Sequence, residues 1–97
     1  MSIEDFSYYL RKAIKQAQPG QIEEIETLMN EGCYTDAYRV TGLDLKKFEF
    51  LLAVYLELKE ENPDENFIGI AMCHLVEDWD QQKAMRAIQE EEGLSTI

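Results

Sequence analysis

Residues 28 to 40 read LMNEGCYTDAYRV, and they contain the end of one helical pattern, a glycine, and the start of the next. Gly32 ends the first pattern because glycine adopts the positive φ of a helix C-terminus without steric cost. The link is so short that the two helices must pack antiparallel, with Tyr34 over the joint and Ala37 leaving room for the facing helix. This stretch predicts a helical hairpin over residues 21 to 41.

Helical spacing of apolar residues extends on both sides of the hairpin. It predicts a helix over residues 3–17, another over residues 45–61, and two more that begin at Pro63 and near Asp78. One kinked helix is the alternative to the last two. Leucine, alanine and glutamate abound while valine is sparse, a composition that favours helices over strands. We therefore expect an all-α fold of five or six short antiparallel helices that form a small helical-hairpin bundle.

Side chains that can cap a helix precede the expected helix starts. These candidate caps are Ser2, Thr35, Asp44, Asn62 and Asp78. Near the C-terminus, Gly93 follows a run of three glutamates and should end the last helix. We therefore expect a single helical domain over residues 1–93 and a flexible tail over residues 94–97.

The net charge of −11 is distributed unevenly along the chain. Residues 1–48 hold 8 acids and 6 bases, whereas residues 49–97 hold 12 acids and 3 bases, which gives −2 and −9. Phosphate binding needs clustered lysine and arginine, so we expect no direct binding of nucleic acid or membrane. The acidic half is either a solvated surface or one shaped for a basic partner. In the second case the acids that would mimic phosphate are Glu57, Glu60, Glu61, Asp64, Glu65, Glu77, Asp78 and Asp80.

From the sequence we expect no targeting or membrane segment. The longest uninterrupted apolar run, residues 50–56, is far shorter than the roughly 20 residues that cross a bilayer. The N-terminus carries acids where a secretory signal carries bases. Cys33 and Cys73 lack the number and spacing of a disulfide scaffold or a zinc site. We therefore expect two thiols and a cytoplasmic location.

Motifs for catalysis or metal binding are weak in this chain. His74 and Asp78 are four residues apart on an expected helix, but two ligands do not make a metal site and there is no second histidine. A hydrogen bond between these two side chains is the simpler interpretation. The acidic segment ELKEENPDEN lacks the spacing of a calcium loop. We expect no enzyme activity, no cofactor and no metal.

The expected helix over residues 45–61 is apolar around much of its circumference. Such a helix either lies at the centre of the fold or reserves one face for a partner. Tyr8 and Phe50 lie off the expected core stripes, so we expect them to be the most exposed apolar residues. If one face is reserved, the residues that would line a groove for a partner are Tyr34, Tyr38, Phe48, Phe50, Leu52, Val54 and Tyr55.

The arrangement of Gly32, Tyr34 and Ala37 after Leu28 resembles the helical hairpin of tetratricopeptide repeats. Ala71 follows Ala37 by 34 residues, which is the length of such a repeat. The glycine and tyrosine do not recur at that interval, so a strict second repeat is absent. The segment LMNEGCYTDA, followed by a helix rich in leucine and aromatic residues, is also similar to the needle-subunit chaperones of type III secretion systems.

This second resemblance implies a short stack of hairpins whose concave apolar surface holds the amphipathic helix of a filament subunit. The residues that it would place on this surface are Tyr34, Tyr38, Phe48, Leu52 and Tyr55. The expected function is a noncatalytic adaptor or chaperone that binds another protein in this way. The alternative is an acidic inhibitor, of the phage or mobile-element type, that blocks a basic protein surface by mimicking nucleic-acid phosphate. A homodimer is also an open alternative, because a helix with two apolar faces can be covered by its own copy.

Overall fold

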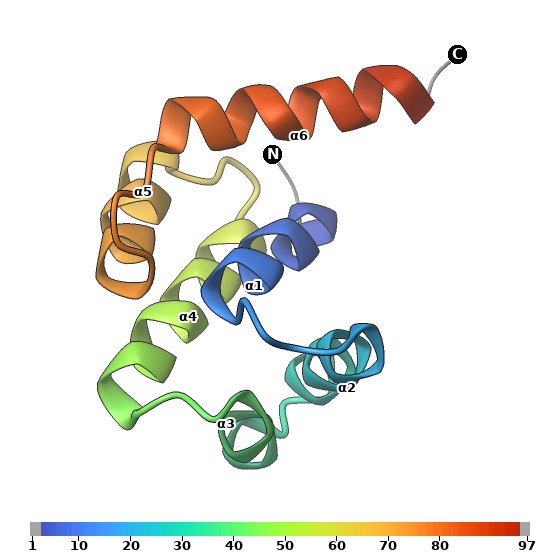
Figure 1. Cartoon of the computed structure of the whole chain (residues 1–97), viewed down its shortest axis with the longest axis vertical. Helices are drawn as coiled ribbons and strands as arrows, with labels where there is room; N and C mark the ends of the chain where they lie inside the picture. Colours follow the sequence, from blue (N-terminus) through green and yellow to red (C-terminus); the bar gives the residue numbers. More distant parts are fainter. Residues whose placement is uncertain (1–2, 96–97) are drawn as a thin grey trace.

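The computed structural model describes residues 3–95, with side chains through Glu90. Over these residues the chain is all-α, as the sequence predicts, and the helices form one small bundle (Figure 1). In chain order the elements are a short 3-10 helix, η1 (Ile3–Asp5), and the α-helices α1 (Phe6–Ala13), α2 (Pro19–Asn30), α3 (Tyr34–Thr41), α4 (Leu45–Leu58), α5 (Glu65–Leu75) and α6 (Gln81–Ser95).

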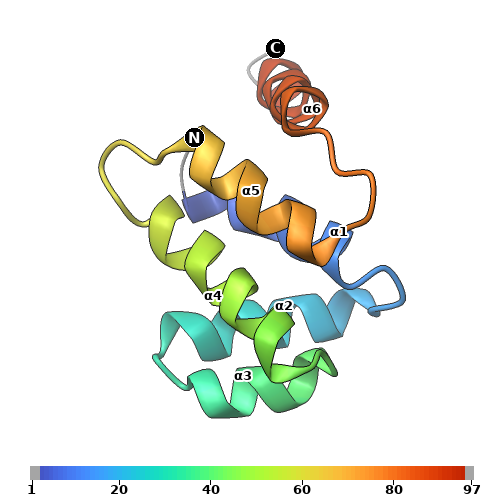
Figure 2. The same ribbon diagram turned by 90° about the vertical axis from the view of Figure 1, so that its left-hand side faces the viewer.

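Helix α4 lies at the centre of the bundle and contacts η1, α1, α3 and α5. Its buried side chains follow one stripe with a spacing of three or four residues: Phe48, Leu51, Val54, Tyr55 and Leu58. Helix α5 runs antiparallel beside α4 in the middle of the molecule, with α2 and α3 at one end and α6 at the other (Figure 2). The core is completed mainly by α1, α2 and α5, which contribute the fully buried residues Tyr9, Leu10, Ile25, Met29, Ile68 and Met72.

The α2–α3 hairpin forms as the sequence predicts, and its turn is a Schellman motif. The backbone N–H of Cys33 donates to the carbonyl of Leu28 at 2.8 Å, and that of Gly32 donates to Met29 at 3.1 Å. Gly32 has a φ of 79°, a left-handed conformation in which a side chain is strained. Ala37 is fully buried, in keeping with the predicted close approach of the two helices.

The open end of the hairpin is also fixed. The side-chain amide of Gln21, at the start of α2, donates to the carbonyl of Val40 near the end of α3 at 2.8 Å. Gly42 then ends α3 with a φ of 70°. Both ends of the hairpin are therefore held, which makes it a rigid support for the start of α4.

The predicted cap of α4 is correct and the predicted cap of α3 is wrong. The carboxylate of Asp44 accepts the backbone N–H of Lys47 at 2.8 Å. Helix α3 begins at Tyr34, one residue before the expected cap Thr35, and no side chain caps it. Because Cys33 already closes the Schellman motif, the chain returns to helical geometry at the next residue.

The expected caps Asn62 and Asp78 each lie two residues before the true caps. Asp64 accepts two backbone N–H groups of α5, at 2.9 and 3.3 Å, and Asp80 accepts one of α6, at 3.1 Å. Each segment offers two acceptors of similar capping strength, so local sequence does not choose between them. Asp78 instead has a φ of 61° and lies in the turn between α5 and α6. The predicted break near Asp78 is confirmed, and one kinked helix is excluded.

Two helices end earlier than the sequence predicts. Helix α1 ends at Ala13 and not at residue 17, because Ile14 leaves helical geometry and packs against the core. Helix α4 ends at Leu58 and not at residue 61. Continuing α4 would place the carboxylates of Glu60 and Glu61 in its last turn, where the helix dipole disfavours negative charge.

Helix α6 continues through Gly93 to Ser95, so Gly93 does not end it as expected. One glycine inside a helix costs only about 1 kcal/mol, which the flanking turns can offset. Ser2 and residues 96–97, which were assigned to a cap and to the tail, lie outside the described residues. Within residues 3–95, no helix combines the length and the apolar character needed to cross a membrane.

Candidate functional site

Three residues that were expected to line a partner groove belong to the core. Phe48 is 5%, Val54 0% and Tyr55 2% exposed, so none of them offers enough exposed area to anchor a partner helix, and this part of the prediction is wrong. The spacing of apolar residues shows that α4 has two apolar faces, but not which of them the neighbouring helices cover.

The other expected groove residues are half-buried and pack against the core: Tyr34, Tyr38, Phe50 and Leu52. The ring centroid of Tyr38 lies 5.3 Å from that of Phe48, and the centroid of Tyr34 lies 6.4 Å from that of Tyr55. Such tilted and edge-on contacts are favourable packing arrangements for aromatic rings. The aromatic side chains of α3 therefore attach α3 to α4 and do not present a concave surface.

Tyr8 and Phe50 were expected to be the most exposed apolar residues, and both are half-buried. Tyr8 packs edge-on against Tyr9 with the ring centroids 5.9 Å apart. Phe50 stacks on His74 with centroids 4.2 Å apart and an interplanar angle of 4°. The large apolar side chains that are exposed lie elsewhere: Ile3, Leu45, Leu56, Phe67 and Ile70.

Helices α4 and α5 lie side by side and antiparallel (Figure 2), and contacts at two points connect one stripe of side chains on α4 to one stripe on α5. The stripes are Phe50, Ala53 and Glu57 on α4, and Phe67, Ile70 and His74 on α5. Both follow the i, i+3, i+7 spacing of one helix face. At one end Phe50 stacks on His74, and at the other end Glu57 accepts the backbone N–H of Asp64 at 2.9 Å. We call these six residues the outer seam.

The outer seam is the largest concentration of exposed apolar side chains that we find among the described residues. Phe67 is 43% and Ile70 63% exposed. Leu56 is 46% exposed and lies one turn from Ala53, which places it beside the seam. Figure 2 shows α4 and α5 at the front of the molecule, with no other drawn element over their outer faces. An apolar surface of this kind marks a site of protein interaction more often than a random part of a surface does.

The predicted acidic residues gather at the two ends of α5. Five precede it or begin it, namely Glu57, Glu60, Glu61, Asp64 and Glu65, and three follow it, namely Glu77, Asp78 and Asp80. Three of the eight also accept backbone hydrogen bonds: Glu57, Asp64 and Asp80. The acidic residues therefore form one group before α5 and a second group in the segment after it, which turns back so that Gln81, next to Asp80, packs against Gly69 in the middle of α5.

His74 and Asp78 do not share a helix face, because α5 ends at Leu75. The expected hydrogen bond between them is replaced by the stack of His74 on Phe50. Among the described residues, no group of three or more metal-ligating side chains comes together. Both cysteines of the chain, Cys33 and Cys73, are free thiols in the structure.

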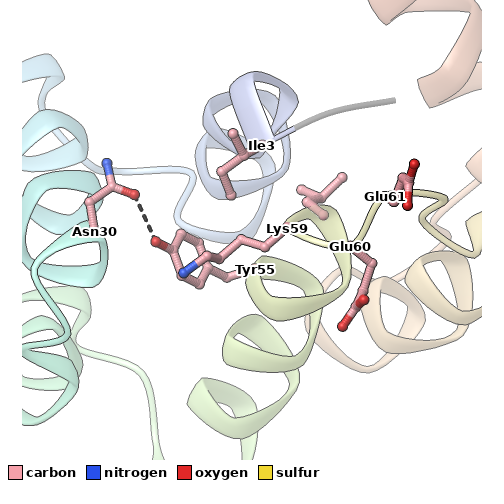
Figure 3. Close-up of a pocket in the computed structure, with 7 residues that line it drawn as sticks. Ile3, Asn30, Tyr55, Lys59, Glu60 and Glu61 are labelled. Carbon is pink, nitrogen blue, oxygen red and sulfur yellow. Dashed lines mark hydrogen bonds between the residues drawn. The ribbon is translucent and has the colours of Figure 1, made fainter.

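A hollow of about 470 Å³ opens between η1, the end of α2 and the end of α4 (Figure 3). It is lined by Ile3, Asn30, Tyr55, Leu58, Lys59, Glu60 and Glu61. The Tyr55 hydroxyl donates to the side-chain oxygen of Asn30 at 2.7 Å, and Lys59 Nζ lies 5.4 Å from the Tyr55 ring centroid. Burial raises the pKa of the Tyr55 hydroxyl, and the neighbouring Tyr34 adds to the rise. The polar groups at the base of the hollow thus hold α2 to α4.

A chain of side-chain hydrogen bonds joins the start of α6 to α1. The Trp79 indole N–H donates to the side-chain oxygen of Gln81 at 2.8 Å, and the Gln81 amide donates to the Tyr9 hydroxyl at 3.1 Å. Burial raises the pKa of Tyr9 to about 12, although the hydrogen bond from Gln81 acts in the opposite direction. Tyr9 is therefore a neutral core residue at physiological pH and a structural one.

Sequence reasoning did not single out Phe67 and Ile70 as candidate binding residues. A signal was present: Ile68, Ala71 and Leu75 already complete a helical stripe, so Phe67 and Ile70 are apolar residues in excess of one face. The same argument was applied to α4 but not to α5.

Comparisons of the chain with known protein families, with curated proteins and with solved structures found no match. The fold and the outer seam are therefore the basis on which a function can be proposed.

Proposed function

We propose that this protein is a noncatalytic protein-binding protein that holds an amphipathic helix of a partner on the outer seam. The exposure of Phe67, Ile70 and Leu56 on one face of the α4–α5 pair is the observation that carries the proposal. A third helix laid along this face would cover all three side chains, which is the helix-in-groove mode of recognition.

The apolar contacts set the scale of the affinity. Burying a side chain of this size completely contributes about 1.5–3 kcal/mol, so covering the exposed half of each residue contributes about 1 kcal/mol. The three residues together therefore offset only part of the entropic cost of association. A useful complex needs further contacts, and the half-buried Phe50 and Ala53 extend the apolar surface on the α4 side.

The resemblance to tetratricopeptide hairpins and to needle-subunit chaperones supports the same class of function, since those chaperones also hold an apolar helix of another protein. The structure changes where that helix would bind. Tyr34, Tyr38, Phe48 and Tyr55, which the resemblance implied as contact residues, pack between α3 and α4. We therefore assign the binding surface to the outer side of α4 and α5.

The acidic inhibitor is the second candidate function, and the two acidic groups at the ends of α5 favour it. A phosphate mimic would bind its target through carboxylates such as Glu60, Glu61 and Glu77. Its affinity would fall steeply with salt and would not depend on Phe67 or Ile70. Replacement of the apolar residues therefore separates the two candidates.

The test uses a capped probe peptide of about 16 residues, with leucines at i, i+4 and i+7 on an alanine and glutamine background. Its binding to the full-length protein is measured by fluorescence anisotropy. We expect the double variant Phe67→Ala and Ile70→Ala to bind at least about tenfold more weakly than the wild type. Ile3→Ala is the control, because Ile3 is an exposed apolar residue of η1 and lies on neither α4 nor α5. Equal affinity of the wild type and the folded double variant would refute the proposal.

A further inference from the structure

We infer that the partner helix carries basic residues at both ends of its apolar stripe, about three helical turns apart. This inference rests on the proposed function, because it specifies the partner of the same outer seam. The observation that supports it is the distribution of charge along α4 and α5.

The middle of the α4–α5 pair contains no acidic or basic residue. Residues 50–56 of α4 and residues 66–76 in and after α5 lack Asp, Glu, Lys and Arg, and His74 is their only titratable group besides Tyr55 and Cys73. In a chain of which 30% is charged, a charge-free surface of this length is suited to contact with an apolar face.

Both ends of this charge-free region are negative. Residues 57–65 hold five carboxylates and one lysine, which gives −4, and Arg86 of α6, which lines a surface hollow together with Glu65, reduces this to −3. The opposite end combines residues 44–49, with two carboxylates and two lysines, and residues 77–78, with two carboxylates, which gives −2. Asp80 is left out because Gln81, the next residue, already packs against Gly69 in the middle of α5. The antiparallel course of α4 and α5 brings the start of α4 and the end of α5 to the same end of the pair, and the chain after Asp78 then turns back along α5 toward α6 (Figure 2).

The spacing of the two acidic ends sets the spacing of the basic residues on the partner. Helix α5 has 11 residues, which corresponds to a length of about 16 Å. A partner helix along the seam therefore places side chains about 11 residues apart over the two ends. This separation exceeds the screening length of about 8 Å at physiological salt, so each end acts on the nearest partner charges independently of the other.

A second copy of this chain fits the seam less well than a basic helix does. Because both ends are negative, parallel and antiparallel pairing of two seams would each bring like charges together. The whole chain also carries a net charge of −11, which adds to the repulsion between two copies. Charge complementarity thus selects a basic partner.

The experiment compares three versions of the probe peptide: lysines at both ends, lysines at one end, and glutamines at both ends. We expect affinity for the wild type to rise in two similar steps, each of about threefold to tenfold at low salt, and both steps to shrink at high salt. The variant Glu60→Gln with Glu61→Gln should reduce the gain in affinity from the lysines at one end of the peptide. Glu77→Gln should reduce the gain from the lysines at the other end. These three residues are exposed and cap no helix. The control Glu23→Gln with Glu24→Gln changes two exposed acids of α2 and should keep both steps.

The other possible results contradict either this inference or the proposed function. Equal affinity for the lysine and glutamine versions would overturn this inference and leave the proposed function intact. If none of the versions binds, the proposed function fails too. Equal binding of a lysine-ended peptide without leucines would show that the acids act alone and would overturn the inference. A stable homodimer that Ile70→Lys separates into monomers would mean that a second copy of the chain covers the seam, and it would also overturn the inference.

Discussion

Ile68 and Ile70 offer a matched test of the exposed seam, because they are the same residue type on the same helix. Ile68 is fully buried and Ile70 is 63% exposed. Replacing a buried isoleucine with alanine removes its packing and leaves a cavity, which costs about 2–5 kcal/mol. A domain of this length has a total free energy of unfolding of about 5–15 kcal/mol. Ile68→Ala should therefore remove a large part of the stability.

Ile70→Ala should change the free energy of unfolding by no more than about 0.5 kcal/mol. The change has a stabilising component, because alanine has a higher helix propensity than isoleucine. The free energy of unfolding of both variants is measured by urea unfolding, followed by the helical circular dichroism signal. The fluorescence of the half-buried Trp79, whose ring centroid lies 5.9 Å from that of Tyr9, gives a second signal from the core. Similar destabilisation by the two changes would refute the reasoning, since it would mean that Ile70 is covered in solution. Repeating the measurement at several protein concentrations would show whether another copy covers it.

Three further predictions concern the hairpin, the helix caps and the core tyrosine. Gly32→Ala should cost about 1–2 kcal/mol in urea unfolding, because Gly32 has a φ of 79°, whereas Gly20→Ala should cost nothing because Gly20 is helical and open to solvent. Asp64→Ala should cost about 1 kcal/mol, because it removes the cap of α5, while Asn62→Ala should have little effect; equal losses would contradict the assignment of the cap. The pKa of Tyr9 is about 12 in the folded protein and 10 in the unfolded chain, so the unfolded chain loses the proton first. The stability that this difference provides is present below pH 10 and is lost as the pH rises toward about 12, and Tyr9→Phe should show a smaller loss of stability over that range than the wild type does.

The parts of the fold that depend on local sequence were predictable. The hairpin at Gly32 and the cap at Asp44 are each determined by a few consecutive residues, and both occur where the sequence places them. The choice between Asn62 and Asp64 was not predictable, because both are good caps and the position of the helix start depends on how α5 packs.

The candidate site depends on packing between helices, which the sequence pattern does not contain. Phe50 meets His74, which is 24 residues away, only because the loop after α4 sets the register of α5. The pattern on α4 showed two apolar faces, but the identity of the covered face depended on α1 and α3. For this reason the sequence predicts a groove position for the buried Val54 and Tyr55 and does not single out the exposed Ile70.

The central claim is that a partner helix binds the outer seam, and backbone NMR shifts test it most directly. The ¹⁵N-labelled protein is titrated with the lysine-ended probe peptide. The account predicts that the largest shift changes follow residues 50–57 of α4 and residues 66–74 of α5, while the signals of α2 and α3 move little. Shift changes centred on Tyr34 and Tyr38 would place the partner on the face of α3 and contradict the account.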